Sequence, residues 1–132
     1  MQMNFQVGDR ASIRRTVTES DIVNFAGITG DFNPVHVDEE YAKDTVFGGR
    51  IAHGLFTASL ISSVLGNKLP GPGCVYLKQT LTFLAPVRIG DTIEAEVEVL
   101  EIIEDKGRLR LSTTCKNQAG KTVLNGEAIV KI

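Results

Sequence analysis

The stretch "GLFTASLISSVLG" at residues 54–66 has thirteen consecutive residues without a charge. Its apolar residues would occupy every side of a helix, and only small hydroxyl-bearing residues fill the gaps between them. A helix without a properly polar face is buried on nearly every side. Because the stretch is too short to cross a bilayer, we expect the rest of the chain to wrap around it.

The second half of the chain has the pattern of an antiparallel sheet. The predicted strands are residues 74–84, 92–103, 109–115 and 122–132. In residues 92–103, apolar residues alternate with Glu94, Glu96 and Glu98, as in a strand with one wet face. Turns are expected at "EDKG" (104–107) and "NQAGK" (117–121). A curved sheet around the uncharged helix would satisfy both halves of the sequence.

The first half predicts a strand and short helices. Residues 3–17 have the pattern of a strand interrupted at "VGD", and Thr18 with Asp21 resembles a capping box that starts a helix. Gly27 and Gly30 end that helix, "GDFNPVH" is expected to form a turn, and Asp38 can cap a further short helix. One strand, two or three helices and then four strands predict an α+β fold. We expect a single domain over residues 1–132.

Composition excludes several functions. The net charge of −2 and the absence of a basic run argue against nucleic-acid binding. No uncharged stretch reaches the length of a membrane span, and the N-terminus has no apolar signal region. We therefore expect a cytoplasmic protein or one of an organelle matrix. Cys74 and Cys115 lie in apolar, strand-like surroundings and are predicted to be core residues rather than nucleophiles or a disulfide.

The candidate chemistry lies in "TGDFNPVHVD", residues 29–38, where Asp31 precedes His36 by five residues. A carboxylate and an imidazole can act together on one water if both lie within hydrogen-bond reach of it. A turn containing Pro34 can bring the two side chains together. The alternative is structural: Asp31 would be a cap and "NP" ordinary turn chemistry.

A second candidate lies where the uncharged helix begins. Its first amides have no helical partner, and Gly54 would let a substrate carbonyl approach the backbone closely, as in an oxyanion hole. Alternatively, Gly54 only eases the entry to the helix. His53 precedes it, and a metal site formed by Asp31, His36 and His53 is conceivable, although the sequence has no HxxH or HExxH spacing.

The segments "FAGITGDFNPVHVDEEYA" and "GGRIAHGLFTASLISSVLG" resemble the MaoC-like dehydratases, in particular the R-specific enoyl-CoA hydratases. The resemblance covers nearly the whole chain. It implies the hot-dog fold, a bent antiparallel sheet wrapped around a long central helix. It also implies a homodimer with the acyl-CoA site at the subunit interface. The implied reaction is reversible addition of water to a trans-2-enoyl thioester, giving the (3R)-3-hydroxyacyl thioester.

The resemblance also implies roles for individual residues. Asp31 and His36 would be the catalytic pair that holds one water, and Asn33 would support their geometry. The Gly54 amide would bind the thioester carbonyl, with His53 beside it among the substrate-binding residues. Ser62 on the central helix matches a serine near the site in some members. No metal, redox cofactor or covalent intermediate is required.

Three other functions stay open. A 3-hydroxyacyl-carrier-protein dehydratase would use the same chemistry on another carrier. A hot-dog thioesterase is disfavoured because residues 54–66 contain no carboxylate. A non-catalytic acyl-binding or dimerisation module would be expected to lack the Asp or the His, and both are present. Candidate contacts to an anionic carrier are Arg50, Lys68, Lys78 and Arg88.

Overall fold

The structure, a computed structural model, describes residues 4–132. Its elements in chain order are β1 (Arg10–Thr16), α1 (Glu19–Thr29), α2 (Pro34–Val37), α3 (Glu39–Ala42), α4 (Gly54–Asn67), β2 (Val75–Gln79), β3 (Thr82–Phe83), β4 (Thr92–Ile103), the 3-10 helix η1 (Glu104–Lys106), β5 (Arg108–Lys116) and β6 (Thr122–Lys131).

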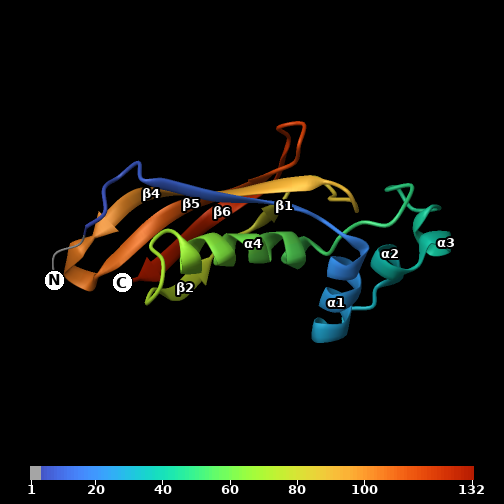
Figure 1. Ribbon diagram of the computed structural model, residues 1–132, viewed down its shortest axis with the longest axis horizontal. Coiled ribbons are helices and arrows are strands. Elements are labelled where there is room, and N and C mark those ends of the chain that lie inside the picture. The colour runs from blue at the N-terminus through green and yellow to red at the C-terminus, as the bar shows by residue number, and fades with distance from the viewer. Residues whose placement is uncertain (1–3) are drawn as a thin grey trace.

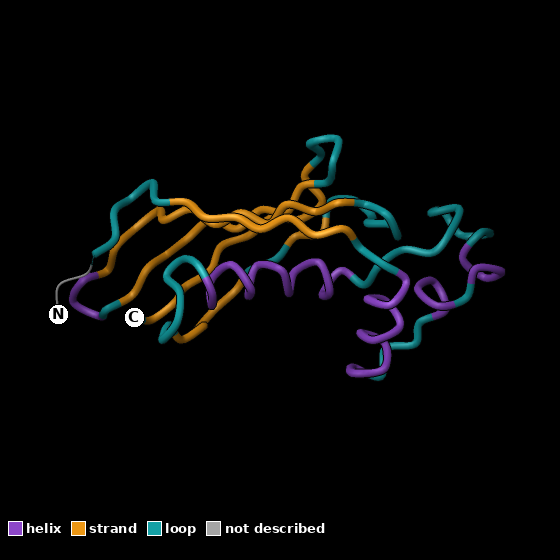
Figure 2. Tube along the Cα trace, in the orientation of Figure 1, coloured by secondary structure: helices purple, strands orange, loops and turns teal. Residues whose placement is uncertain are grey.

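The strands form one antiparallel sheet in the order β1-β4-β5-β6-β2, and β3 pairs with β6 beside β2. Helix α4 runs along one face of this sheet, and α1, α2 and α3 project from one end of it (Figure 1). The trace in Figure 2 shows that the loops joining these short helices to α4 lie at the same end. The predicted α+β arrangement is therefore confirmed.

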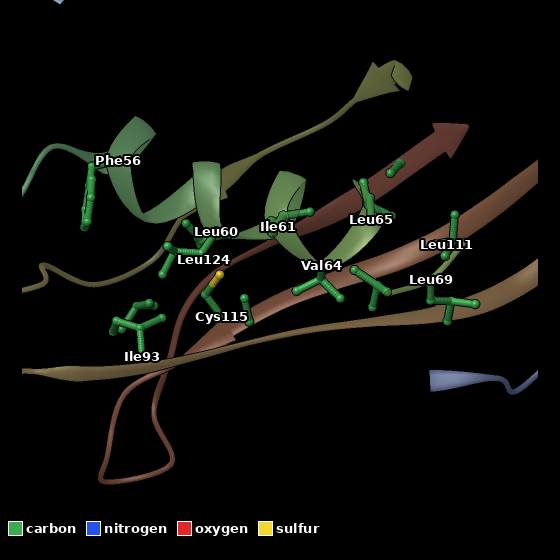
Figure 3. Packing of buried hydrophobic residues seen from close by; sticks show 14 of the residues in the cluster. Phe56, Leu60, Ile61, Val64, Leu65, Leu69, Ile93, Leu111, Cys115 and Leu124 are labelled. Carbon is green, nitrogen blue, oxygen red and sulfur yellow. The ribbon is translucent and has the colours of Figure 1, made fainter. Parts of the chain in front are cut away.

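The core lies between α4 and the sheet (Figure 3). The buried side chains of α4 are Phe56, Thr57, Leu60, Ile61, Val64 and Leu65. They pack against the apolar face of β4, whose Ile93, Ala95, Val97 and Val99 are fully buried as the alternation predicted. Burial of each large apolar side chain contributes about 1.5–3 kcal/mol, so this contact accounts for much of the stability of the fold.

One face of α4 is open, so the prediction of burial on nearly every side was only partly right. Leu55 is 60% exposed, and Ser59 and Ser62 on the same face are exposed. A single sheet can cover only one side of a helix, and the open side forms a groove with Tyr76 and Leu77 of the edge strand β2. Among residues 4–132, no helix combines the length and the hydrophobicity that crossing a membrane demands.

The helix caps follow the sequence closely. Thr18 and Asp21 form the predicted capping box of α1, which ends at Gly30 in the left-handed conformation (φ 79°). Asp38 caps α3 by accepting from the Tyr41 N–H. The expected turn at residues 30–36 was wrong in part, since residues 34–37 form the one-turn helix α2 with Asn33 as its cap and Pro34 at its first position.

The strand boundaries differ from prediction in two places. The first strand starts at Arg10 because Asp9 and Gln6 close a turn before it; residue 3 of the predicted strand lies outside the described residues. The stretch 74–84 divides into β2 and β3, so five strands rather than four follow α4. Four helices rather than two or three precede them.

Both cysteines are free. Cys115 is fully buried in the core, and burial raises the pKa of its thiol to about 12. Cys74 is half-buried and its Sγ lies 3.4 Å from the main-chain oxygen of Leu65. The prediction of a core residue is confirmed for Cys115, whose thiol stays protonated at neutral pH.

The main chain passes close to Gly126 at Thr80, between β2 and β3, and this contact supports a stability prediction. A Cβ atom at Gly126 would lie 1.8 Å from the main-chain oxygen of Thr80, which cannot move without displacing the strand. We expect Gly126→Ala to lower the free energy of unfolding by about 3 kcal/mol, measured by urea denaturation. The control is Gly27→Ala in α1, where the added methyl meets nothing within 4 Å and should stabilise by about 0.4–1 kcal/mol. Equal denaturation midpoints for Gly126→Ala and the parent would contradict this reading of the contact.

Candidate active site

The segment that follows α1 is fixed by a chain of local hydrogen bonds. The carboxylate of Asp31 accepts from the Asn33 N–H at 3.2 Å, and the side-chain oxygen of Asn33 accepts from the Val35 N–H at 3.2 Å. The second bond caps α2, which carries His36. Asn33 therefore sets the path of the chain between Asp31 and His36.

His36 presents one ring nitrogen to the site. It is 8% exposed, and its Nδ1 lies 2.8 Å from the main-chain oxygen of Ile51. Since a carbonyl can only accept, Nδ1 carries the hydrogen of the neutral ring and Nε2 is left as an acceptor. Burial lowers the pKa of His36, an effect that the bond to Ile51 and the nearby Asp31 partly oppose.

His53 lies directly beside these two residues. Its Nε2 is 3.0 Å from the main-chain oxygen of Asp31, and its ring stacks on that of His36 with centroids 3.9 Å apart at 28°. One carboxylate oxygen of Asp31 and one ring nitrogen each of His36 and His53 all lie within 4.8 Å of one another. One water with hydrogen bonds of about 2.8 Å can span a gap of this size. The three groups are also of the types that ligate cations.

These residues open onto a cavity of about 480 Å³, a size typical of small-molecule sites. Asp31, His36, His53 and Gly54 line it at one side, and its remaining walls are mostly apolar: Phe47, Ile51, Ala52, Leu55, Phe83, Leu84, Ala85, Pro86, Val87, Val123 and Leu124, with Thr57 as the one further polar residue. The cavity therefore combines a carboxylate and imidazole rings with an apolar compartment.

Gly54 is the first residue of α4, where an amide has no helical partner. Among residues 4–132, no backbone or side-chain acceptor takes its N–H. The aromatic ring of Phe83 packs against its Cα, because a Cβ atom at this position would lie 2.6 Å from the Cε1 atom of Phe83. A free amide at a helix start, in the wall of the cavity, can donate to a ligand carbonyl.

Residues 6–122 match the family model described as MaoC like domain. The chain belongs to the MaoC-like dehydratase family. A 3-hydroxybutyryl-CoA dehydratase from Methylorubrum extorquens is 54% identical over 129 residues, which are 98% of this chain and 82% of that protein. An (R)-specific enoyl-CoA hydratase from Rhodospirillum rubrum is 52% identical, covering 95% of this chain and 86% of that protein.

Solved structures of the family share the fold. The (R)-hydratase from A. caviae involved in PHA biosynthesis superposes with a TM-score of 0.96 at 40% identity, covering 99% of each chain. The hot-dog fold that the MaoC-like resemblance implied is therefore confirmed.

The structure brings together four of the six predicted site residues, and Asn33 holds the segment between two of them. Asp31, His36, His53 and Gly54 line one cavity. Ser62 does not join them: it lies on the open face of α4, in the groove that β2 borders. Within one chain Ser62 is therefore not part of the cavity, and its predicted role stays a prediction.

Sequence reasoning missed the apolar wall and two contacts to His36. The wall residues come from the loop before α4, the first turn of α4, β3, the loop after β3, and β6, and no single pattern in the sequence links these segments. Thr57 was counted only as a small residue of the helix, yet it is buried with an unpaired Oγ1 among the described residues. The contacts of His36 with Arg50 and His53 join residues far apart in sequence, for which no local signal exists.

Three of the four candidate carrier contacts are engaged within the chain. Arg50 holds both carboxylate oxygens of Glu19 at 2.8 Å and donates through Nε to the main-chain oxygen of His36 at 2.6 Å. This pairing lowers the pKa of Glu19. Lys68 donates to the main-chain oxygen of Ser12 at 2.7 Å, and Arg88 donates to that of Phe47. Within residues 4–132, the side chain of Lys78 is exposed and its ammonium has no hydrogen-bond or ion-pair partner, while its main chain pairs with Ile129 of β6.

Arg50 should therefore support the His36 segment rather than bind the carrier. We expect Arg50→Gln to lower kcat for enoyl-CoA hydration by about 10-fold, because α2 loses its tie to α1 and His36 shifts, while KM changes little. Steady-state kinetics measure both constants. The control is Arg10→Gln, which removes an ion pair with Glu98 on β4 and should change neither constant. A rise in KM at constant kcat for Arg50→Gln would instead indicate a carrier contact.

Proposed function

We propose that this protein is an (R)-specific enoyl-CoA hydratase, which reversibly adds water to trans-2-enoyl-CoA to give (3R)-3-hydroxyacyl-CoA. The observation that carries the proposal is the position of Asp31 and His36 in one cavity with the free amide of Gly54. Membership of a family of hydratases and dehydratases, which are hydro-lyases, supports the reaction class.

The mechanism follows from these groups. The thioester carbonyl accepts from the Gly54 N–H, which stabilises negative charge on its oxygen as C3 is attacked. A water donates hydrogen bonds to the Asp31 carboxylate and to Nε2 of His36. Its oxygen forms a bond to C3, the C2–C3 π electrons move toward the thioester to give an enolate, and the pair takes up one proton. The pair then returns one proton to C2, so atoms and charge balance.

The protonation of His36 sets a pH prediction. With Nδ1–H fixed on Ile51, Nε2 can accept from water only while it is unprotonated. Burial lowers the pKa of His36 from its ordinary 6.5, so protonation of Nε2 requires a more acidic solution. We expect the midpoint of the acid limb of kcat/KM for hydration to lie below pH 6.5. A pH–rate profile with its acid limb above pH 6.5 would contradict the assignment.

The decisive test of the reaction is hydration of crotonyl-CoA, followed by analysis of the product's configuration. Loss of the conjugated enoyl absorbance should accompany formation of (3R)-3-hydroxybutyryl-CoA, and EDTA should leave the rate unchanged. Formation of the (3S) product, or no reaction with short or longer enoyl-CoAs, would refute the proposal. Release of free thiol would indicate a thioesterase, which is disfavoured because α4 carries no carboxylate.

The site chemistry does not distinguish between the two groups that can carry the acyl chain, CoA and acyl carrier protein. A 3-hydroxyacyl-carrier-protein dehydratase would use the same pair and the same amide. Comparison of kcat/KM for one acyl group on CoA and on acyl carrier protein separates the two. We expect the CoA thioester to be preferred by at least 10-fold.

We further propose that the chain works as a homodimer, one MaoC-like domain per subunit over residues 1–132. The support is the open groove between α4 and β2, where Leu55, Tyr76 and Leu77 are exposed. Exposed apolar patches of this kind are typical of interfaces. Sedimentation equilibrium should give twice the mass of the 14.3 kDa chain. The cytoplasmic location stays a prediction.

A further inference from the structure

We propose that His53 is a positioning residue for hydration, one buried imidazole that fixes the main chain of Asp31 and the ring of His36 relative to each other. The proposal rests on the function proposed above and assigns His53 a role distinct from contact with substrate. It is carried by the two contacts that the His53 ring makes to the members of the catalytic pair.

The first contact fixes Asp31. The carboxylate of Asp31 lies on an irregular segment between α1 and α2 and is exposed. The main-chain oxygen of Asp31 accepts from Nε2–H of His53 at 3.0 Å, because a carbonyl can only accept. His53 is 2% exposed, so water does not compete for this bond. The bond ties an otherwise exposed segment to the buried start of α4.

The second contact fixes His36. The stacked rings lie 3.9 Å apart at 28°, so the His53 ring limits rotation of the His36 ring about its side-chain bonds. Phe25 of α1 packs against His53 with centroids 4.9 Å apart. The His53 ring is therefore held from α1 while it holds the ring that presents Nε2 to the cavity.

The backbone of His53 is itself anchored to α4. Its main-chain oxygen accepts from the Phe56 N–H at 3.1 Å and the Thr57 N–H at 3.4 Å. It is the cap residue of α4, yet its side chain makes no capping bond. The imidazole of His53 instead contacts Asp31 and His36. The next residue, Gly54, has the free amide. His53 thus places the pair relative to the predicted oxyanion donor.

His53 also affects the charge of His36. The ring of His36 faces the ring of His53, the carboxylate of Asp31 and the main-chain oxygen of Ile51. In addition, the guanidinium of Arg50 donates to the main-chain oxygen of His36. Arg50 is neutralised by Glu19 and lies near Glu39. The His53 ring covers one face of His36, and burial and the electrostatic interaction with His53 both lower the pKa of His36.

Two substitutions separate the contacts. His53→Phe keeps an aromatic ring beside His36 and removes the donor to Asp31. His53→Gln keeps an amide donor of similar reach and removes the ring. We expect His53→Phe to lower kcat for crotonyl-CoA hydration at least 10-fold with KM within twofold of the parent, and His53→Gln to lose less. A role in stability alone would change the thermal midpoint without this split between kcat and KM.

A titration of His36 gives a readout independent of activity. The chain has two histidines, so tag-free protein with labelled histidine gives two ring signals by NMR, and His53→Gln leaves only that of His36. We expect the titration midpoint of His36 to be higher in His53→Gln than in the parent, and the acid limb of kcat/KM to move in the same direction.

A kcat for His53→Phe within twofold of the parent, together with an unchanged His36 midpoint in His53→Gln, would overturn the proposal. If His53→Phe does not fold, kcat and the His36 midpoint of His53→Gln decide it. A parent protein that fails to hydrate crotonyl-CoA refutes the proposed function instead, whereas the His36 titration still decides whether His53 controls its neighbour.

Discussion

Replacement of Asp31 by asparagine should lower kcat/KM for enoyl-CoA hydration by about 10²–10⁴-fold, the range typical of a lost acid–base group. Asparagine has nearly the same shape, and its side-chain oxygen can still accept from the Asn33 N–H. The change therefore removes the charge and the proton acceptor while keeping the turn. Steady-state hydration of crotonyl-CoA measures the loss, and an unchanged thermal midpoint shows that the fold is retained.

Asp38→Asn is the matched control for this substitution. Asp38 lies in the same segment, caps α3 through the Tyr41 N–H and is not among the residues that line the cavity. Asparagine is an equally good cap, so kcat/KM should stay within twofold of the parent. Equal kcat/KM for Asp31→Asn and Asp38→Asn would show that Asp31 is not an acid–base group of the reaction, whereas a parent protein without hydration activity would support the non-catalytic acyl-binding module that the sequence left open.

Gly54→Ala should lower kcat by about 10²-fold, because the free amide at the start of α4 would move. The added Cβ would lie 2.6 Å from Cε1 and 2.8 Å from Cδ1 of Phe83. Either the ring or the first turn of α4 must shift. No left-handed backbone angle is involved at Gly54, so backbone strain does not contribute to this effect. Steady-state kinetics with crotonyl-CoA measure the loss.

The double variant Gly54→Ala/Phe83→Ala tests this origin. Removal of the Phe83 ring makes room for the methyl group, so the alanine at position 54 should cost much less in the Phe83→Ala background than in the parent. Coupling of this kind is what a double-mutant cycle detects. If the cost is the same in both backgrounds, the clash with Phe83 is not the cause. If Gly54→Ala alone has the activity of the parent, the amide is not held in the position we infer.

The main features of the fold could be predicted because their signals are local. The alternation in β4 and the uncharged run in α4 each specify a buried face within a few residues. The open face of α4 could not be predicted, since it depends on how much of the helix one sheet covers. Helix α2 could have been predicted: Asn33 followed by Pro34 is a helix-start signal, although its single turn resembles loop chemistry in sequence.

The proximity of Asp31 and His36 could be predicted from the sequence, and the residues that hold them in place could not. Asp31 and His36 belong to one short segment of distinctive composition. The stacking of His53 on His36 and the bonds of Arg50 to Glu19 and to the His36 carbonyl bring together three separate segments. Such contacts follow from the packing of α1 and α2 at the start of α4. The spacing of these residues in the sequence does not predict them.

The central claim is that Asp31 and His36 act on one shared water. The measurement that tests it most directly compares hydration of crotonyl-CoA by Asp31→Asn, by His36→Asn, whose amide can still donate to the Ile51 carbonyl, and by the double variant. Groups that work as one unit lose their effect together. We predict that the kcat/KM of the double variant is about equal to that of the less active single variant. A double variant whose loss is the product of the two single losses would show two independent groups and contradict the shared water.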